Sequence, residues 1–114
     1  MRRLKTYSAQ SGYVYQYRYE GQRTFHSGAD RGIEFVFSFS HDRKLWHAIP
    51  VLVSDDALTS WERSHTRELS STERYAIAKM ALFQAFDERA PEQMKEPVRV
   101  RAADVSGIIE SLGL

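Results

Sequence analysis

Aromatic residues recur at every second position in two stretches of the chain, and this alternation limits the folds open to it. Residues 13–19 read Tyr-Val-Tyr-Gln-Tyr-Arg-Tyr, and residues 33–39 place Ile33, Phe35, Phe37 and Phe39 on one side of a period of two. Side chains of a β-strand point alternately to the two faces of a sheet, so this period predicts strands that share an aromatic face. The first half of the chain is therefore expected to form a sheet.

Turn-forming residues divide this half into four predicted strands. Glu20-Gly21 resembles a tight turn because glycine tolerates positive φ, which gives a return strand over residues 22–26 and a loop over 27–32. Residues 41–44 read as a hairpin loop and 45–53 as the fourth strand. Pro50 has no N–H to donate, so this strand is expected at a sheet edge or with a bulge. Residues 1–11 are interpreted as a candidate flexible basic segment.

The second half reads mostly as helices. Ser54 has the character of an N-cap for a short helix over residues 55–65. Ser70 and Glu73 have the spacing of a capping box, which predicts a long helix from there to about residue 90, ended by Pro91. This helix is apolar nearly all round, which is typical of burial on more than one side, beneath a sheet and beneath either the C-terminal helix or a second subunit.

The last elements complete an α+β fold. Residues 98–101 are expected to form a fifth strand, and 105–112 an amphipathic helix that closes at Gly113. The order β-β-β-β-α-α-β-α predicts an antiparallel sheet of four to five strands packed on a long central helix. The 114 residues suit one domain, 1–114. The neighbour of the fifth strand stays open at this stage.

Composition excludes several classes of protein. The chain has no cysteine, which rules out disulfide frameworks, thiolate catalysis and cysteine-ligated zinc. Its net charge is +1, so the molecule as a whole is not strongly polycationic. The basic start is not followed by an apolar run, and no stretch is long enough to cross a bilayer. We expect a cytoplasmic protein without a membrane partner.

No chemistry-bearing motif supports catalysis or a cofactor. The sequence lacks a nucleophile elbow, a phosphate-binding loop, a dinucleotide fingerprint and a zinc-protease helix. His41 and His47 flank one hairpin with Asp42 between them, but a metal site needs a third ligand that the sequence does not supply. We therefore predict no metal and no cofactor, and interpret the chain as a non-enzyme, with an unrecognised active site as the contrary hypothesis.

The tyrosine strand suggests binding, although the sequence leaves open whether its tyrosine side is core or exposed. Tyrosine, tryptophan and arginine are enriched at protein interfaces. The predicted binding residues are Tyr15, Tyr17, Tyr19, Arg18 and Trp46. The main interpretation is a small non-catalytic binding or regulatory module that acts through an aromatic sheet face. Its expected partner is another protein or a second copy of the chain, as a homodimer.

Two other functions are compatible with the sequence. Aromatic side chains on a sheet stack on unpaired bases, so the tyrosine strand with nearby arginines also suits single-stranded nucleic acid. A cavity between sheet and helix, lined by Phe35, Phe37 and Phe86, would instead suit a small molecule or an enzyme. The sequence names neither the ligand nor the oligomeric state.

Overall fold

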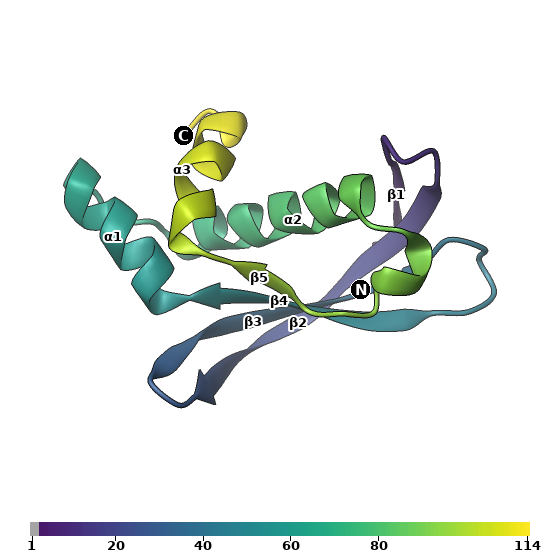
Figure 1. Ribbon diagram of the computed structural model, residues 1–114, viewed down its shortest axis with the longest axis horizontal. Helices are drawn as coiled ribbons and strands as arrows, with labels where there is room; N and C mark the ends of the chain where they lie inside the picture. The colour runs from purple at the N-terminus through teal and green to yellow at the C-terminus, as the bar shows by residue number, and fades with distance from the viewer. Residues whose placement is uncertain (1–2) are drawn as a thin grey trace.

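The computed structural model describes residues 3–114 and has the predicted order of strands and helices (Figure 1). A single turn of 3₁₀ helix, η1, is added between the long helix and the fifth strand. The elements are β1 (Lys5–Ser8), β2 (Val14–Ser27), β3 (Asp30–Ser40), β4 (His47–Ser54), α1 (Asp55–His65), α2 (Ser71–Glu88), η1 (Pro91–Gln93), β5 (Val98–Val100) and α3 (Ala102–Leu112). The predicted α+β class and the predicted order β-β-β-β-α-α-β-α are confirmed.

The five strands form one sheet in the order β1-β2-β3-β4-β5. The first four are joined by hairpin connections and pair antiparallel. β5 pairs parallel to β4, with Val51 opposite Val98 and Val53 opposite Val100. A parallel neighbour requires a crossover connection, which α1, α2 and η1 supply.

The expected turn at Glu20-Gly21 is wrong. β2 runs through this point as one long strand, and the register with β3 shifts between Tyr19 and Gly21, which marks a β-bulge. Gly21 has a φ of 145°, a conformation that suits a bulge as well as a turn. The chain reverses later, at Gly28, between the paired residues Ser27 and Asp30.

The number of strands still agrees with the prediction, because two predicted strands form the single strand β2 and β1 is an additional strand. Lys5–Ser8, within the segment treated above as a candidate flexible start, pairs antiparallel with β2. Residues 1 and 2 of that segment lie outside the described part of the chain. β1 has four residues, three of them exposed, so it offers little hydrophobic pattern from which to predict it.

Pro50 lies at a local sheet edge, although β4 has neighbours on both sides. It pairs with Val36 of β3, while β5 begins opposite the next residue, Val51. Because β5 does not extend beside Pro50, the missing N–H of Pro50 leaves no acceptor on β5 without its hydrogen bond. The prediction holds for this residue and is wrong for the strand as a whole.

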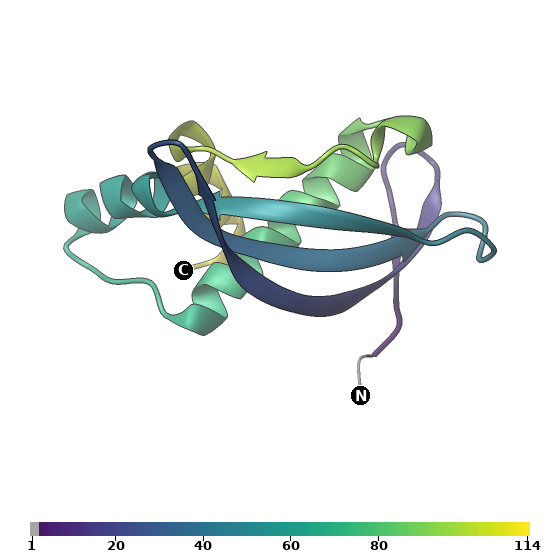
Figure 2. The ribbon, with the colours of Figure 1, turned by 90° about the horizontal axis from the view of Figure 1, so that it is seen from below.

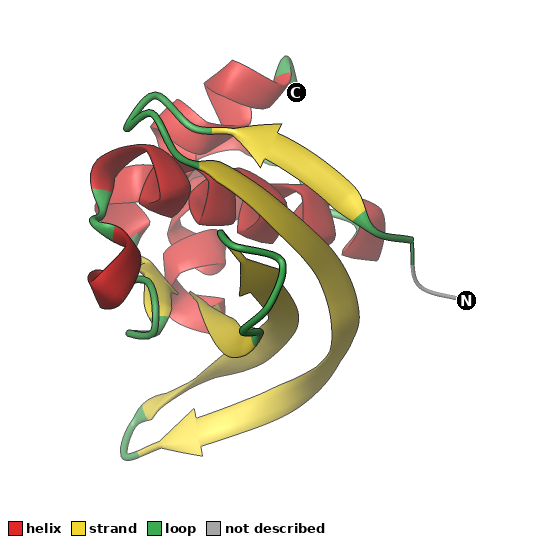
Figure 3. Ribbon diagram, turned by 90° about the vertical axis from the view of Figure 1, so that its right-hand side faces the viewer, coloured by secondary structure: helices red, strands yellow, loops and turns green. Residues whose placement is uncertain are grey.

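The helices lie on one face of the sheet, and the long strands bend around them (Figure 3). The sheet face that carries the alternating aromatic residues packs against α2. Phe37 of β3 and Ile49 of β4 are fully buried on this face, and so are Leu82 and Phe86 of α2. α3 packs against both α1 and α2 and buries Ile108. The apolar circumference of α2 is thus covered by the sheet and by α3, so this helix does not by itself require a second subunit.

The predicted starts of α1 and α2 are confirmed in position, whereas α3 begins at Ala102, before the predicted residue 105. α2 begins with a complete capping box, in which Ser70 Oγ accepts from the backbone N–H of Glu73 and Glu73 accepts from that of Ser70. Ser54 occupies the N-cap of α1, but its hydroxyl caps no backbone N–H. It donates instead to Asp30 Oδ1 at 2.7 Å and so ties β4 to the start of β3.

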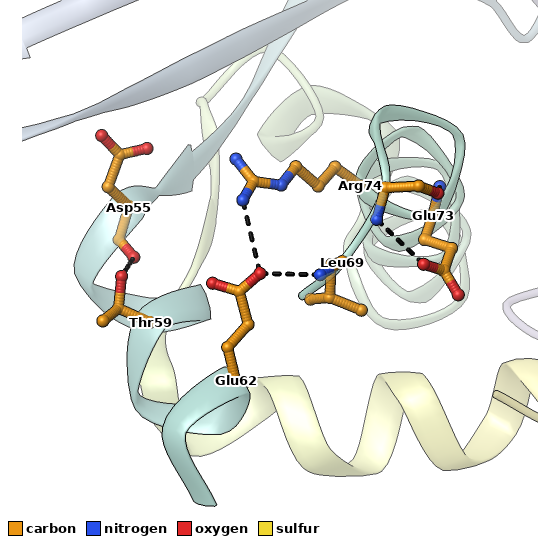
Figure 4. Close-up of polar contacts among 7 residues, drawn as sticks. Asp55, Thr59, Glu62, Leu69, Glu73 and Arg74 are labelled. Atoms are coloured by element: carbon orange, nitrogen blue, oxygen red, sulfur yellow. Dashed lines mark hydrogen bonds and ion pairs between the residues drawn. The ribbon is translucent and has the colours of Figure 1, made fainter. Parts of the chain in front are cut away.

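Glu62 fixes the corner between α1 and α2 (Figure 4). Its Oε2 accepts from the backbone N–H of Leu69 at 2.7 Å and from the Arg74 guanidinium at 3.4 Å. A second ion pair joins Arg67 to Glu73 at the capping box. These contacts set the direction in which α2 enters the space beneath the sheet.

Asp87 attaches β1 to the far end of α2. A carboxylate in the last turn of a helix opposes the helix dipole, so it needs a compensating contact. Asp87 accepts from Tyr7 Oη at 2.8 Å and from the backbone N–H of Gln10 at 2.9 Å. Burial, followed by this hydrogen bond, raises the pKa of Tyr7 to about 12, so the phenol remains a donor at neutral pH.

Asp42 organises the β3–β4 hairpin loop. Its Oδ1 accepts from the backbone N–H groups of Lys44 at 2.8 Å and Leu45 at 3.0 Å, and from Ser40 Oγ at 3.0 Å. These hydrogen bonds, those from the backbone first, favour the charged carboxylate and lower the pKa of Asp42 to about 2.

Asp42→Asn is expected to lower the free energy of unfolding at neutral pH, and the deficit should shrink in acid. The carboxyl has a reference pKa of 3.8 in the unfolded chain and about 2 in the folded one, so its stabilisation is present above about pH 4 and is lost as the pH falls towards 2. Denaturant unfolding across this range measures the difference between wild type and variant. Glu110→Gln, at an exposed position on α3, is the control; a deficit that did not change with pH would contradict the assignment.

Candidate functional site

One face of the sheet is not covered by any helix of the described chain, and Figure 2 looks onto it. We call it the open face. Its position follows from the register, because residues opposite one another point to the same side. The open face consists of Val14, Gln16, Arg18 and Glu20, then Arg23 and Phe25 after the bulge, Glu34, Val36, Ser38 and Ser40 of β3, Ala48, Pro50 and Leu52 of β4, Arg99 of β5, and Trp46 beside β4.

The structure separates the five predicted binding residues. Tyr15 and Tyr17 are 0% and 4% exposed and point towards α2, and Tyr19 is half-buried on the same side. Arg18 and Trp46 lie together on the open face. The face of β2 that carries Tyr15, Tyr17 and Tyr19 therefore belongs to the hydrophobic core. The alternating aromatic residues form the apolar face of the sheet on which α2 packs.

Arg18 and Trp46 belong to a polar cluster at one end of the open face. The Arg18 guanidinium carbon lies 5.0 Å from the Trp46 ring centroid, which is a cation–π contact. Arg18 Nε donates to Glu20 Oε2 at 3.1 Å and to Ser38 Oγ at 3.2 Å, and Ser38 Oγ donates to Glu20 at 2.6 Å. The cluster therefore holds both the ring and the guanidinium in fixed orientations.

The middle of the open face is apolar. Val36, Pro50 and Leu52 lie side by side on β3 and β4, and all three are half-buried although no helix covers them. Arg23 and Glu34 flank this strip with a two-pronged ion pair at 2.9 and 3.1 Å. An uncovered sheet face usually carries polar side chains at these positions. The apolar strip is the departure from that pattern.

A pocket of about 330 Å³ opens at the other end of the face, where β4 and β5 run parallel and lead into α1 and α3. Phe25 and Leu52 line its apolar side, and Arg99 and Arg101 line its polar side together with Asp30. Sequence reasoning missed this pocket. The available signal was two strands that each pass directly into a helix, since parallel strands place such helix starts at one sheet edge.

The proposed cavity between sheet and long helix is filled by the side chains that were expected to line it. Phe86 stacks on Tyr15 with ring centroids 4.2 Å apart, and Phe39 approaches Phe86 to 6.0 Å. Phe35 and Phe37 are 2% and 0% exposed. The three phenylalanines Phe35, Phe37 and Phe86 are therefore core residues, because close packing of aromatic rings leaves no void there.

Within residues 3–114, no group of three histidine, aspartate or glutamate side chains is placed to hold a metal ion. None of the helices in the same range combines the length and apolarity needed to cross a membrane. Comparisons with models of protein families, with curated proteins and with solved structures found no match for this chain. The geometry of the open face is therefore the basis on which a function is assigned.

Proposed function

We propose that the chain is a small non-catalytic binding or regulatory module that uses its open face to bind a second copy of itself. The observation that supports this proposal is the uncovered apolar strip of Val36, Pro50 and Leu52. Apolar patches that remain exposed on a monomer commonly mark interaction sites. Burial of this strip against another protein would remove it from water.

The charges around the strip favour a second copy as the partner. The open face carries arginines at positions 18, 23 and 99 and glutamates at 20 and 34, so neither sign dominates. In a two-fold dimer the same patch meets itself, which is favourable when the patch carries both signs. Arg18 and Trp46, two of the side chains that the sequence proposed for binding, would lie at the rim of this contact.

The same charges argue against single-stranded nucleic acid. Arg18 contacts Glu20 at 3.1 Å, and Arg23 contacts Glu34 at 2.9 Å, so both guanidinium groups already have carboxylate partners. Phosphate binding would have to compete with these ion pairs. Of the tyrosines proposed for base stacking, Tyr15 and Tyr17 are buried against α2.

The decisive experiment is the mass in solution of wild type, Leu52→Arg and Leu114→Arg. We expect wild type to sediment as a dimer and Leu52→Arg as a monomer. An arginine there would bring a charge into the interface between Arg99 and a Glu34 already paired with Arg23, and the cost of desolvating it would oppose dimerisation. Leu114 is 47% exposed beyond α3, on the helical side, so Leu114→Arg should remain dimeric. Wild type that stays monomeric up to high micromolar concentration, or that binds a random oligonucleotide at low salt, would overturn the proposal.

A further inference from the structure

The pocket at the end of the open face has a basic side and an acidic side, with an apolar floor between them. Its volume of about 330 Å³ is in the range of sites for small ligands. It lies where β4 passes into α1 and β5 passes into α3, so strands and helix starts build its walls (Figure 1). Groups carried on such elements are held in place more firmly than groups on loops.

Arg99 and Arg101 form the basic side of the pocket. Arg99 lies in the middle of β5, and Arg101 follows the strand in extended conformation, so their side chains are on the same side of the sheet. Among residues 3–114, neither guanidinium forms an ion pair with a carboxylate, whereas those of Arg18 and Arg23 on the same face each do. Arg101 also occupies the N-cap of α3, where a cation opposes the helix dipole. Helix stability therefore does not explain an arginine at this position.

Asp30 and Asp56 form the acidic side of the pocket. Asp30 begins β3, and its Oδ1 accepts from Ser54 Oγ at 2.7 Å, which holds the carboxylate beside the end of β4. Its Oδ2 accepts no hydrogen bond within the described chain, so this oxygen can bind a ligand. Asp56 lies in the first turn of α1. Neither carboxylate is paired with an arginine of residues 3–114, so the pocket keeps the two charges apart.

Leu52 and Phe25 form the apolar floor, and both are half-buried. Leu52 of β4 is opposite Arg99 of β5, and the Phe25 ring reaches the floor over Gly32, where a Cβ would lie only 3.0 Å from the ring. Neighbouring strands lie about 5 Å apart, so the backbones of β3 and β5 on either side of β4 are about 10 Å apart. An apolar surface of this order of width therefore separates Asp30 from Arg99.

We propose that this pocket binds a small ω-amino carboxylate, a molecule with a carboxylate and an ammonium group at opposite ends of an alkyl chain. The carboxylate lies against the two arginines, whose planar guanidinium groups suit paired oxygens. The ammonium lies against the two aspartates, and the alkyl chain lies on Leu52 and the Phe25 ring. A simple anion or a simple cation would leave one charged side of the pocket without a partner.

The test is an amide NMR titration of the full chain with 6-aminohexanoate. We expect saturable shifts confined to the pocket, at residues 52–57 and 99–102, with a dissociation constant in the millimolar range. Hexanoate and hexylamine each lack one of the two charges, and 3-aminopropanoate is too short to reach from Asp30 to Arg99. Each of these three should bind about tenfold more weakly. Hexanoate that binds as tightly as 6-aminohexanoate, or shifts spread over the whole surface, would overturn the proposal.

Substitutions on each side of the pocket separate the two contacts. The double variant Arg99→Gln, Arg101→Gln should lose the saturable shifts. Asp30→Asn keeps an acceptor for Ser54 but not the charge, so it should bring 6-aminohexanoate close to the affinity of hexanoate. Arg63→Gln, in the last turn of α1 and outside the pocket, is the matched control and should bind as wild type does.

Circular dichroism checks that each variant is folded. A folded double variant that binds 6-aminohexanoate as tightly as Arg63→Gln would overturn the proposal. Although Leu52 also belongs to the apolar strip, the pocket extends beyond the sheet onto α1 and α3. Because the shifts are read residue by residue, the titration reports on the pocket whether the chain is a monomer or a dimer.

Discussion

Phe86→Ala is expected to lower the free energy of unfolding by about 3–5 kcal/mol, the range for removing a buried phenylalanine ring. Phe86 is fully buried at the point where α2 meets the sheet. Its ring stacks on Tyr15 with centroids 4.2 Å apart, and its centroid lies 5.8, 6.2 and 6.0 Å from those of Tyr7, Tyr17 and Phe39. Its removal would leave a cavity that rings on three strands cannot easily close. Urea unfolding followed by circular dichroism measures the loss.

Two neighbouring substitutions serve as controls for Phe86→Ala. Phe83→Ala removes a half-buried ring from the same helix and should cost clearly less. Tyr15→Phe keeps the stacked ring and removes only a hydroxyl that has no hydrogen-bond partner among the described residues, so it should leave stability unchanged or raise it. A loss for Phe86→Ala no larger than that for Phe83→Ala would contradict the central position assigned to Phe86.

Gly32→Ala is expected to lower the free energy of unfolding by about 2–3 kcal/mol, because the added methyl group has no room. A Cβ at position 32 would overlap the carbonyl oxygen of Val53 on the neighbouring strand, and it would lie 3.0 Å from both the Phe25 ring and Ser54 Cα. The ring of Phe25 covers the glycine, an arrangement that protects backbone lacking a side chain. The strand would have to move away from β4, and Phe25 would have to shift as well.

Gly107→Ala is the matched control for Gly32→Ala. This glycine lies within α3, and a Cβ there meets nothing within 4 Å. Alanine is the better helix former, so this substitution should raise stability by about 0.5–1 kcal/mol. Thermal unfolding of both variants tests the two signs together. Equal stability of the two variants would show that the strand tolerates a side chain at Gly32.

The helices could be predicted from the sequence because their signals are local. The capping box at Ser70 and Glu73 and the αL residue Gly113 mark helix ends within a few residues of chain, and the structure has both. The strands depended on contacts made elsewhere in the fold. Gly21 permits a turn or a bulge equally well, and the pairing of β2 with β3 on both sides of Gly21 decides for the bulge.

The candidate site could be predicted only in part for a related reason. Periodicity showed that Tyr17 and Arg18 point to opposite faces of one strand, but it could not say which face α2 would cover. The contact between Arg18 and Trp46 joins residues on different elements, and the pocket joins β4 and β5 with the starts of two helices. Which residues come together in this way depends on the order of the strands in the sheet. No short stretch of sequence indicates that the fifth strand pairs with β4.

That fifth strand gives the end of the chain a particular structural role. β5 forms the pairing of greatest sequence separation in the sheet, since it joins Val98 to Val51, whereas β1, β2 and β3 each pair with the strand that follows directly along the chain. Residues 98–114 also carry α3, which covers the side of α2 that the sheet leaves bare. This terminal segment thus completes both the sheet and the layer of helices. A shorter form of the protein that stops before Val98 would expose the edge of β4 and the apolar face of α2 that α3 covers. An unpaired strand edge and an exposed apolar surface are the features through which incompletely folded chains most readily aggregate.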